Sequence, residues 1–184
     1  ALTSKQDLIV NKQPRGISPG EVDNPGDKQD DIIVTLSSGN QLVRLGNPGS
    51  GADWTIDQTV DVGDRPKDIE PLPIGGSIGT VFLVGNEGSN SMSVVASNAQ
   101  GSLEVIASVD LQATPLDMTT VDLGSLRSEV LCCSENDDNF LSTHIFSGED
   151  ATNADLLLQR EREEDGNGIS LSTSSSNLVR FCDV

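Results

Sequence analysis

The feature that most constrains the fold of this chain is a repeated hairpin pattern. The segment "VFLVGNEGSNSMSVV" (81–95) has two apolar flanks around a Gly/Ser/Asn turn, which is typical of two short strands joined by a tight turn. The segment "DIIVTLSSGNQLVRL" (31–45) aligns with it at an offset of 49 residues. At the same offset, "TVDVGDRPKDI" (59–69) falls on "SVDLQATPLDM" (108–118). The sequence therefore predicts one structural unit that is used several times.

Two further segments extend the repeat towards the C-terminus. Another step of 49 residues leads to "VLCCSENDDNFLSTHIF", which again has apolar flanks around an acidic turn, and "ISLSTSSSNLVRF" (169–181) repeats the first hairpin. We interpret residues 1–30 as leading strands of a preceding unit. The predicted copies are approximately 31–79, 80–128, 129–167 and 168–184.

A period in the forties made of short strands and turns indicates an all-β fold of β-propeller blades, each a four-stranded antiparallel sheet. In the second copy we expect strands near 81–85, 92–97, 103–111 and 117–122. The first of these is nearly continuously apolar, so we interpret it as the innermost strand, with Val34, Leu83 and Cys132 in matching positions.

The copies amount to about three and a half blades in a single domain or fragment. Propellers close with four to eight blades, so we expect part of a larger ring, or a ring completed by partner chains. The segment "ADLLLQREREED" (154–165) is the only stretch with helical character, and we favour a strand there, because its leucines occupy the place of a strand in the preceding copy.

Composition narrows the classes of ligand. The formal net charge of -18 argues against nucleic acid and anionic membrane surfaces, because few cations are present to neutralise phosphates. No apolar run is long enough to cross a bilayer, so we expect no membrane insertion. Clustered carboxylates favour either simple solubility or binding of a divalent cation.

Two families share these patterns. The segment "FLVGNEGSNSMSVVASNAQGSLEVIASVDLQATPLDM" resembles a blade of the YVTN or lactonase-like propellers, and "GEVDNPGDKQDDIIVT" (20–35) is similar to the FG-GAP or VCBS repeat. The second resemblance implies an Asp-rich calcium loop that runs into an inner strand. The residues that carry the first are Val84, Asn86, Ser89, Asn90, Val94 and Pro115.

The candidate calcium ligands are Asp23, Asp27 and Asp31, at the first, fifth and ninth positions of that loop. Pro25 stands at the third position and offers no side-chain oxygen, and the charge of Lys28 disfavours a cation. A solvated acidic turn is the alternative. The segment "EEDGNG" (163–168) stands in the same relation to its strand and is a second candidate.

Two other sets of residues have predicted structural roles. Asp68 and Asp117 each stand two residues after a proline, Pro66 and Pro115, and we expect them to organise turns by accepting backbone N–H groups. Three cysteines leave an odd count: Cys182 can bridge to only one of the adjacent pair at 132 and 133, and our candidate disulfide is Cys133–Cys182.

No residue is assigned a catalytic or cofactor-binding role. The only histidine, His144, is interpreted as an ordinary strand residue, and neither glycine-rich stretch is followed by the Lys-Ser/Thr of a phosphate loop. Apart from the candidate calcium, the sequence predicts no cofactor.

The first functional hypothesis is a non-enzymatic, secreted or cell-surface module that offers a scaffold for protein or glycan contacts at the blade tips. The resemblance to lactonase-like propellers implies the alternative of a fragment of a propeller hydrolase, and a structural subunit of an extracellular assembly is a third. A hydrolase requires polar groups that converge on a central channel, for which Asp31, Thr80 and Glu129 are the candidates. The partner is a protein, a glycan, or the remaining blades of the same polypeptide.

Overall fold

The computed structural model of the chain is all-β, and it describes most residues up to 162. The ranges described are 8–22, 30–47, 49, 53–72, 80–98, 100–111, 113–124, 127–135, 141–148 and 156–162, with side chains described as far as residue 121. Within these ranges the chain forms twelve strands and one short 3-10 helix, Ser37–Gly39. The predicted all-β class is confirmed.

The strands form three four-stranded antiparallel sheets, each built from consecutive strands. The first sheet contains β1 (Pro14–Gly20), β2 (Asp31–Leu36), β3 (Gln41–Gly46) and β4 (Thr55–Asp61). The second contains β5 (Pro66–Leu72), β6 (Val81–Asn86), β7 (Ser91–Ser97) and β8 (Leu103–Asp110). The third contains β9 (Thr114–Gly124), β10 (Arg127–Glu135), β11 (Leu141–Gly148) and β12 (Leu156–Arg162). The strand favoured over a helix near 156–162 is therefore confirmed.

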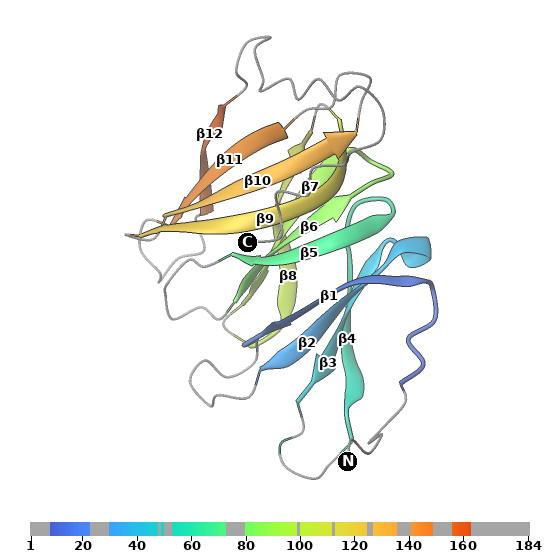
Figure 1. The fold of residues 1–184 in the computed structure, drawn as a ribbon. Coiled ribbons are helices and arrows are strands. Elements are labelled where there is room, and N and C mark those ends of the chain that lie inside the picture. Colours follow the sequence, from blue (N-terminus) through green and yellow to red (C-terminus); the bar gives the residue numbers. More distant parts are fainter. Residues whose placement is uncertain are drawn as a thin grey trace, which may run out of the picture.

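The three sheets are arranged side by side as propeller-like blades. Figure 1 shows β1, β5 and β9 following one another at the shared inner edge, where β5 contacts both of its neighbours. The outer strands β4 and β8 also contact each other, but less extensively. Each sheet thereby covers one face of the next, which a single twisted sheet cannot do for itself.

The sheets are displaced by one strand from the predicted copies. Val34, Leu83 and Cys132 lie in β2, β6 and β10, which are the second strands of their sheets, so their assignment to innermost strands is wrong. The expectation that residues 1–30 belong to a preceding blade is also wrong for β1, which pairs with β2. The second strand is continuously apolar because it is covered on both faces, and that property does not distinguish it from an innermost strand.

The first two hairpins align at an offset of 50 residues, not 49. Asn40 and Asn90 both adopt the left-handed conformation, with φ of 55° and 47°, immediately before β3 and β7. This conformation is uncommon for residues other than Gly and Asn, so it marks the same turn position in both sheets. The offset of 49 instead matched Gly39 with Gly88, and a slip of one residue moves every side chain of a strand to the opposite face.

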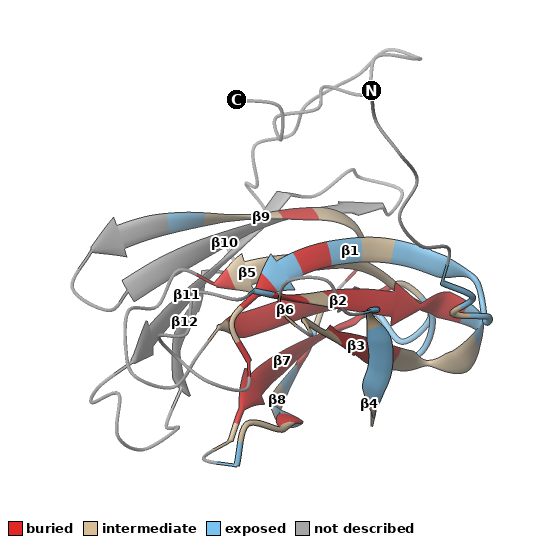
Figure 2. Cartoon of the chain, turned by 90° about the horizontal axis from the view of Figure 1, so that it is seen from below, coloured by how far each residue is buried: buried red, intermediate tan, exposed pale blue. Residues whose placement is uncertain are grey.

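The apolar core lies between the sheets. Between the first and second sheets, Ile33 and Leu42 pack with Ile69, Phe82, Val84 and Val95, and all of these side chains are buried. Between the second and third sheets, Leu83, Met92 and Val94 pack with Met118 of β9. Figure 2 shows this burial concentrated on the central strands β2, β3, β6 and β7, whereas the outer strand β4 is largely exposed.

Each inner strand has a proline as its first or second residue, followed by a β-bulge. The pairing register shifts between Pro14 and Ile17 in β1, between Pro66 and Asp68 in β5, and opposite Pro115 in β9. Proline cannot donate to a sheet ladder, so it is compatible with these strand starts on an open edge. The sequences "PRGI", "PKDI" and "PLDM" are thus equivalent, and the match in β1, which lacks the Asp shared by the other two, was missed from sequence.

Candidate functional site: a carboxyl cluster on the inner strands

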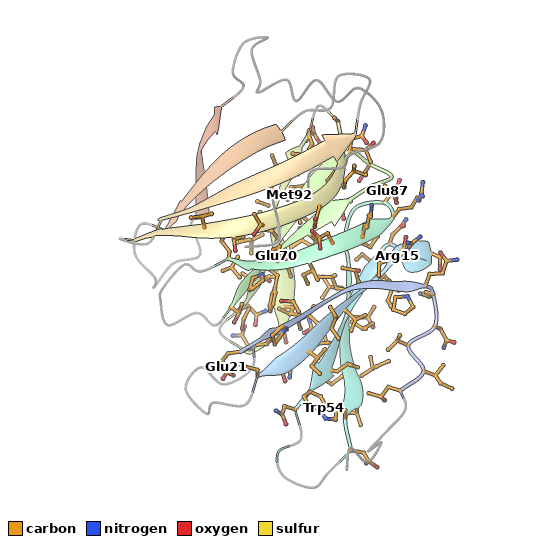
Figure 3. All side chains as sticks on the ribbon, viewed as in Figure 1. Arg15, Glu21, Trp54, Glu70, Glu87 and Met92 are labelled. Carbon is orange, nitrogen blue, oxygen red and sulfur yellow. The ribbon has the colours of Figure 1, made fainter. Side chains whose placement is uncertain are left out.

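Three carboxyl groups lie together where the inner strands of the second and third sheets meet. Asp68 and Glu70 belong to β5, and Asp117 belongs to the adjacent β9. The three residues are half-buried. Asp68 and Glu70 are two residues apart on one strand, so they stand on the same face as Leu72, which packs into the core between these sheets. Figure 3 labels Glu70 on β5 at the inner edge of the fold.

Asp68 connects the second sheet to the third. Its Oδ1 accepts a hydrogen bond from the backbone N–H of Ile69 at 3.0 Å, and its Oδ2 accepts one from the backbone N–H of Met118 at 2.7 Å. Met118 is 1% exposed and lies in the core between the two sheets. The carboxylate therefore satisfies a backbone donor of β9 that has been removed from water.

Two members of the cluster, Asp68 and Glu70, have raised pKa values. Burial raises the pKa of Asp68 to about 6, with a further increase from the charge of Asp117 and from a hydrogen bond to its carboxyl group, against the backbone N–H groups that lower it. Burial also raises the pKa of Glu70 to about 7, together with repulsion from Asp68 and Asp117. Desolvation and like charges both disfavour the ionised form, so Asp68 and Glu70 hold protons at a higher pH than ordinary carboxyl groups do.

The arrangement favours a cation or a proton. Near neutral pH, ionisation of the cluster places like charges close together in partly desolvated positions, which is energetically unfavourable. No cation in the described part of the chain contributes to the pKa shifts of Asp68 and Glu70. A positively charged group from a ligand would offset this repulsion. Among the described residues, no group of three or more His, Cys, Asp or Glu side chains has the geometry to hold a metal ion.

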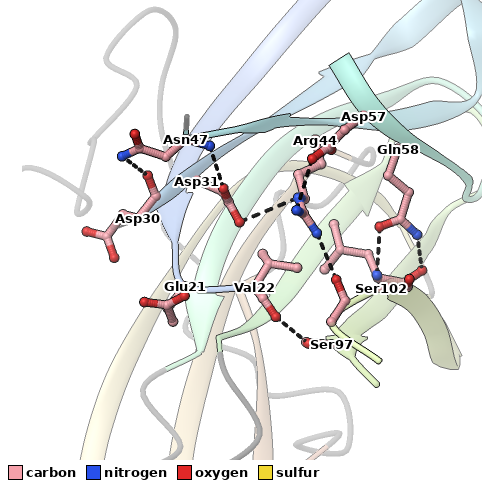
Figure 4. Close-up of polar contacts among 12 residues, drawn as sticks. Glu21, Val22, Asp30, Asp31, Arg44, Asn47, Asp57, Gln58, Ser97 and Ser102 are labelled. Carbon is pink, nitrogen blue, oxygen red and sulfur yellow. Dashed lines mark hydrogen bonds and ion pairs between the residues drawn. The ribbon is translucent and has the colours of Figure 1, made fainter. Parts of the chain in front are cut away.

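The predicted calcium ligands lie elsewhere and only one of them is described. Asp31 begins β2 and is 1% exposed, with its Oδ1 accepting from the backbone N–H of Asn47 at 2.8 Å and its Oδ2 lying 3.5 Å from Arg44 Nε. Asp23 and Asp27 lie outside the described residues, as does 163–168. The calcium site therefore stays a prediction, and Asp31 takes part in an ion pair with Arg44 and a hydrogen bond with Asn47 (Figure 4).

Polar side chains bridge the first and second sheets, and sequence reasoning missed them. Arg44 donates from Nη1 to the carbonyl of Gly101 at 2.7 Å and pairs through Nη2 with Asp57 at 2.9 Å. Gln58 of β4 donates to the carbonyl of Leu103 at 2.7 Å and accepts from its N–H at 2.8 Å (Figure 4). The signal available in the sequence was an arginine inside an otherwise apolar strand, "QLVRL".

The other predicted positions are distributed over the fold. Pro66 and Asp68 lie at the bulge of β5, Pro115 and Asp117 lie at that of β9, and Asp68 accepts backbone N–H groups from its own strand and from the next sheet. The backbone of Cys133 lies in β10 opposite Leu141, and Cys182 lies outside the described residues, so the disulfide stays a prediction.

The three residues that were candidates for a channel site do not gather where they are described. Asp31 is held in its ion pair. Thr80 instead joins the first two sheets, because its N–H donates to the carbonyl of Glu21 at 2.8 Å and its hydroxyl accepts from the N–H of Glu21 at 2.9 Å. The side chains of Glu129 and His144 are outside the described part of the chain.

Comparisons with known proteins place the fold but not the function. No protein-family model matches the chain, and no curated protein matches it. A protein of unknown function from Desulfotomaculum acetoxidans has a similar structure, with a TM-score of 0.58 and 19% sequence identity over 83% of this chain. A crystal structure of BBS1N in complex with ARL6DN is less similar, with a TM-score of 0.42 and 12% identity over 79% of this chain.

The chain spans only part of either structure: 42% of the Desulfotomaculum acetoxidans chain and 51% of the BBS1N chain. The ratio of the two coverages, 83% to 42%, makes the first of these about twice as long as the present chain. Across the part of the chain that the structure describes, no helix has the length and apolar character needed to span a membrane.

Proposed function

We propose that this chain is a non-enzymatic protein-binding module whose partner inserts a basic side chain at the carboxyl cluster of Asp68, Glu70 and Asp117. The observation that carries this proposal is the partial burial of the cluster, which together with repulsion from Asp68 and Asp117 raises the pKa of Glu70 to about 7. A lysine or arginine side chain that approached these groups would favour their ionised forms and gain Coulomb energy in a partly desolvated site. The net charge of -18 supports a basic partner, because it attracts one over long distances.

The location of the cluster also supports binding. Asp68 and Asp117 lie at the start of inner strands, at the edge that the sheets share, where one ligand can contact two blades at once. Half-buried carboxyl groups remain reachable from solvent, unlike the fully buried Asp31. A glycan ligand, a role as a subunit of an extracellular assembly, and a secreted or cell-surface location stay predictions from the sequence.

The test is a calorimetric titration of the chain with a hexalysine peptide at pH 8 and pH 5. We expect binding at pH 8 that is weakened about fivefold or more by Glu70→Gln, because the neutral amide removes one charge and part of the repulsion. Glu104→Gln is the matched control, since Glu104 is an exposed residue of the outer strand β8. Equal losses in both variants would show general attraction to an acidic protein and would overturn the proposal.

The raised pKa values of Asp68 and Glu70 also favour a second candidate function, that of a lactonase-like hydrolase. A carboxyl group with a pKa near 6 or 7 can act as a general acid or base at neutral pH. The two functions separate in an assay with a chromogenic lactone or ester. Turnover that disappears in Glu70→Gln and persists in Glu104→Gln would favour the hydrolase, and absence of turnover in the unmodified chain would favour the binding module.

A further inference from the structure

One position near the start of each inner strand can be compared directly across the three sheets. Ile17 of β1, Ile69 of β5 and Met118 of β9 occupy equivalent places, each three residues after the proline of its strand. Ile69 is 3% exposed and packs against Ile33 and Leu42 of the first sheet. Met118 is 1% exposed and packs against the second sheet. Ile17, which no preceding sheet covers, is 68% exposed.

The residues beside Ile17 on its face of the first sheet are also apolar, as expected of a surface that packs against another sheet. Ile17 pairs with Val34, and Val34 pairs with Val43, so these three side chains stand on the face of the first sheet that is turned away from the second. On the second sheet the matching row is Ile69, Val84 and Ser93, and the first sheet packs against its Ile69 and Val84. We call the corresponding face of the first sheet its open face.

Part of the open face is already covered by other residues of the same chain. Val10 and Trp54 pack on Val34, Val43 and Leu45, which are at most 6% exposed. Among the strand residues of this face, the most exposed aliphatic side chain is therefore Ile17 of the inner strand. A buried position that becomes an exposed large aliphatic side chain in one copy of a repeat indicates a missing neighbour, because exposure of that side chain otherwise has no energetic advantage.

The outer strands provide an internal control for this argument. Ile56 of β4 lies opposite Leu45 and is 41% exposed, and Val105 of β8 lies opposite Val95 and is 39% exposed. These two side chains at the outer edge are thus about equally exposed, although only the second sheet is preceded by another sheet in the described part of the chain. Among the described strand residues, the exceptional exposure is on the inner strand, where the blades of this chain contact one another most closely.

We propose that the open face receives the third sheet of a second copy of this chain, and that two copies associate head to tail into a closed ring of six blades. In the part of the chain that the structure describes, each copy supplies three sheets, and six lies within the four to eight blades with which propellers close. The similar Desulfotomaculum acetoxidans chain is about twice as long as this one, so one such chain has the length of two copies. A head-to-tail contact between two different surfaces generates a ring when its rotation closes.

The contact needs no residue of the carboxyl cluster, so it does not depend on the function proposed above. Docking of a sheet on the open face would bury Ile17 as the first sheet buries Ile69. The incoming sheet must also accommodate Val10, which lies on this face, and the adjacent Ile9, which is 81% exposed. Each ring contains two such contacts, so one substitution weakens both.

Sedimentation velocity of the full chain, from about 1 to 100 µM, tests this proposal. We expect a mass of twice the 19.4 kDa of one chain, with no larger species as the concentration rises. Ile17→Asp should raise the dimer dissociation constant about 100-fold, since each of the two contacts loses about tenfold by placing a charge against an apolar face. The thermal transition of this variant, followed by circular dichroism, verifies that it still folds, as its exposed position predicts.

Ile56→Asp is the matched control, because Ile56 stands on the same face but at the outer edge, and it should change the dissociation constant less than about threefold. A chain that is monomeric throughout the concentration range would overturn the proposal and leave the face to blades of another polypeptide. Open-ended polymers would overturn closure at two copies. Equal weakening by both variants would overturn the assignment to the inner strand.

Discussion

The buried ion pair of Arg44 and Asp31 leads to a quantitative prediction about the first sheet. Both side chains are nearly inaccessible, at 9% and 1% exposure, and Arg44 Nε lies 3.5 Å from Asp31 Oδ2. With the offset of 50 residues, the matching positions of the second sheet are Val94 and Val81, which are both buried. The repeat therefore supplies its own apolar version of the pair.

Arg44→Val should lower the free energy of unfolding by about 3 to 5 kcal/mol, because it leaves the carboxylate of Asp31 buried without its cation. It also removes the hydrogen bond to Gly101 and the contact with the more exposed Asp57, which contributes less. For a chain of this size, the melting temperature should fall by roughly 10 °C.

The double variant Asp31→Val/Arg44→Val should recover most of this loss and lie within about 2 kcal/mol of the unmodified chain, since paired valines need no charge compensation. The remaining deficit reflects the N–H of Asn47 and the carbonyl of Gly101, which lose their side-chain partners. The assay is urea unfolding of the unmodified chain, Asp31→Val, Arg44→Val and the double variant, monitored by circular dichroism, with the coupling energy taken from the cycle. Strictly additive losses would refute the reasoning, because they would mean that Arg44 does not compensate Asp31.

Two more predictions concern the inner strands. The raised pKa values of Glu70 and Asp68 mean that protonation stabilises the folded state fully below their ordinary values and that this contribution is lost as pH rises through about 6 to 7. Urea unfolding should therefore show Glu70→Gln more stable than the unmodified chain by about 1 kcal/mol at pH 8 and nearly equal to it at pH 5, and an equal difference at both values would contradict the pKa assignment. Gly16→Ala should destabilise the chain by about 1 to 3 kcal/mol in thermal unfolding, because its Cβ would lie 2.9 Å from the carbonyl oxygen of Lys67 in the adjacent β5. Gly101→Ala should also destabilise, but through its positive φ of 74° instead of a collision, and a neutral Gly16→Ala would show that β1 can move away from β5.

Several elements of the fold could be predicted from the sequence because their signals are local. The hairpins at 31–45 and 81–95 are recognisable from apolar flanks and turn residues. The preference for a strand near 156–162 followed from its place in the repeat and agrees with β12. The residues of the carboxyl cluster were only partly recognised: Asp68 and Asp117 were singled out for turns, and Glu70 was not noticed.

By itself, the sequence determined that the chain is a series of short antiparallel strands in a repeating order, since turn chemistry and apolar periodicity act over a few residues. Only the tertiary structure decided which strand begins each sheet, which face of each strand meets a neighbour, and which charges lie together. The strand that begins the first sheet joins it by pairing with β2 across residues 21–30, beyond the reach of a local pattern. Which of Ile33 and Val34 faces the second sheet depends on the strand register, because a shift of one residue would exchange them. The register is set when whole sheets pack and bury their apolar sides together.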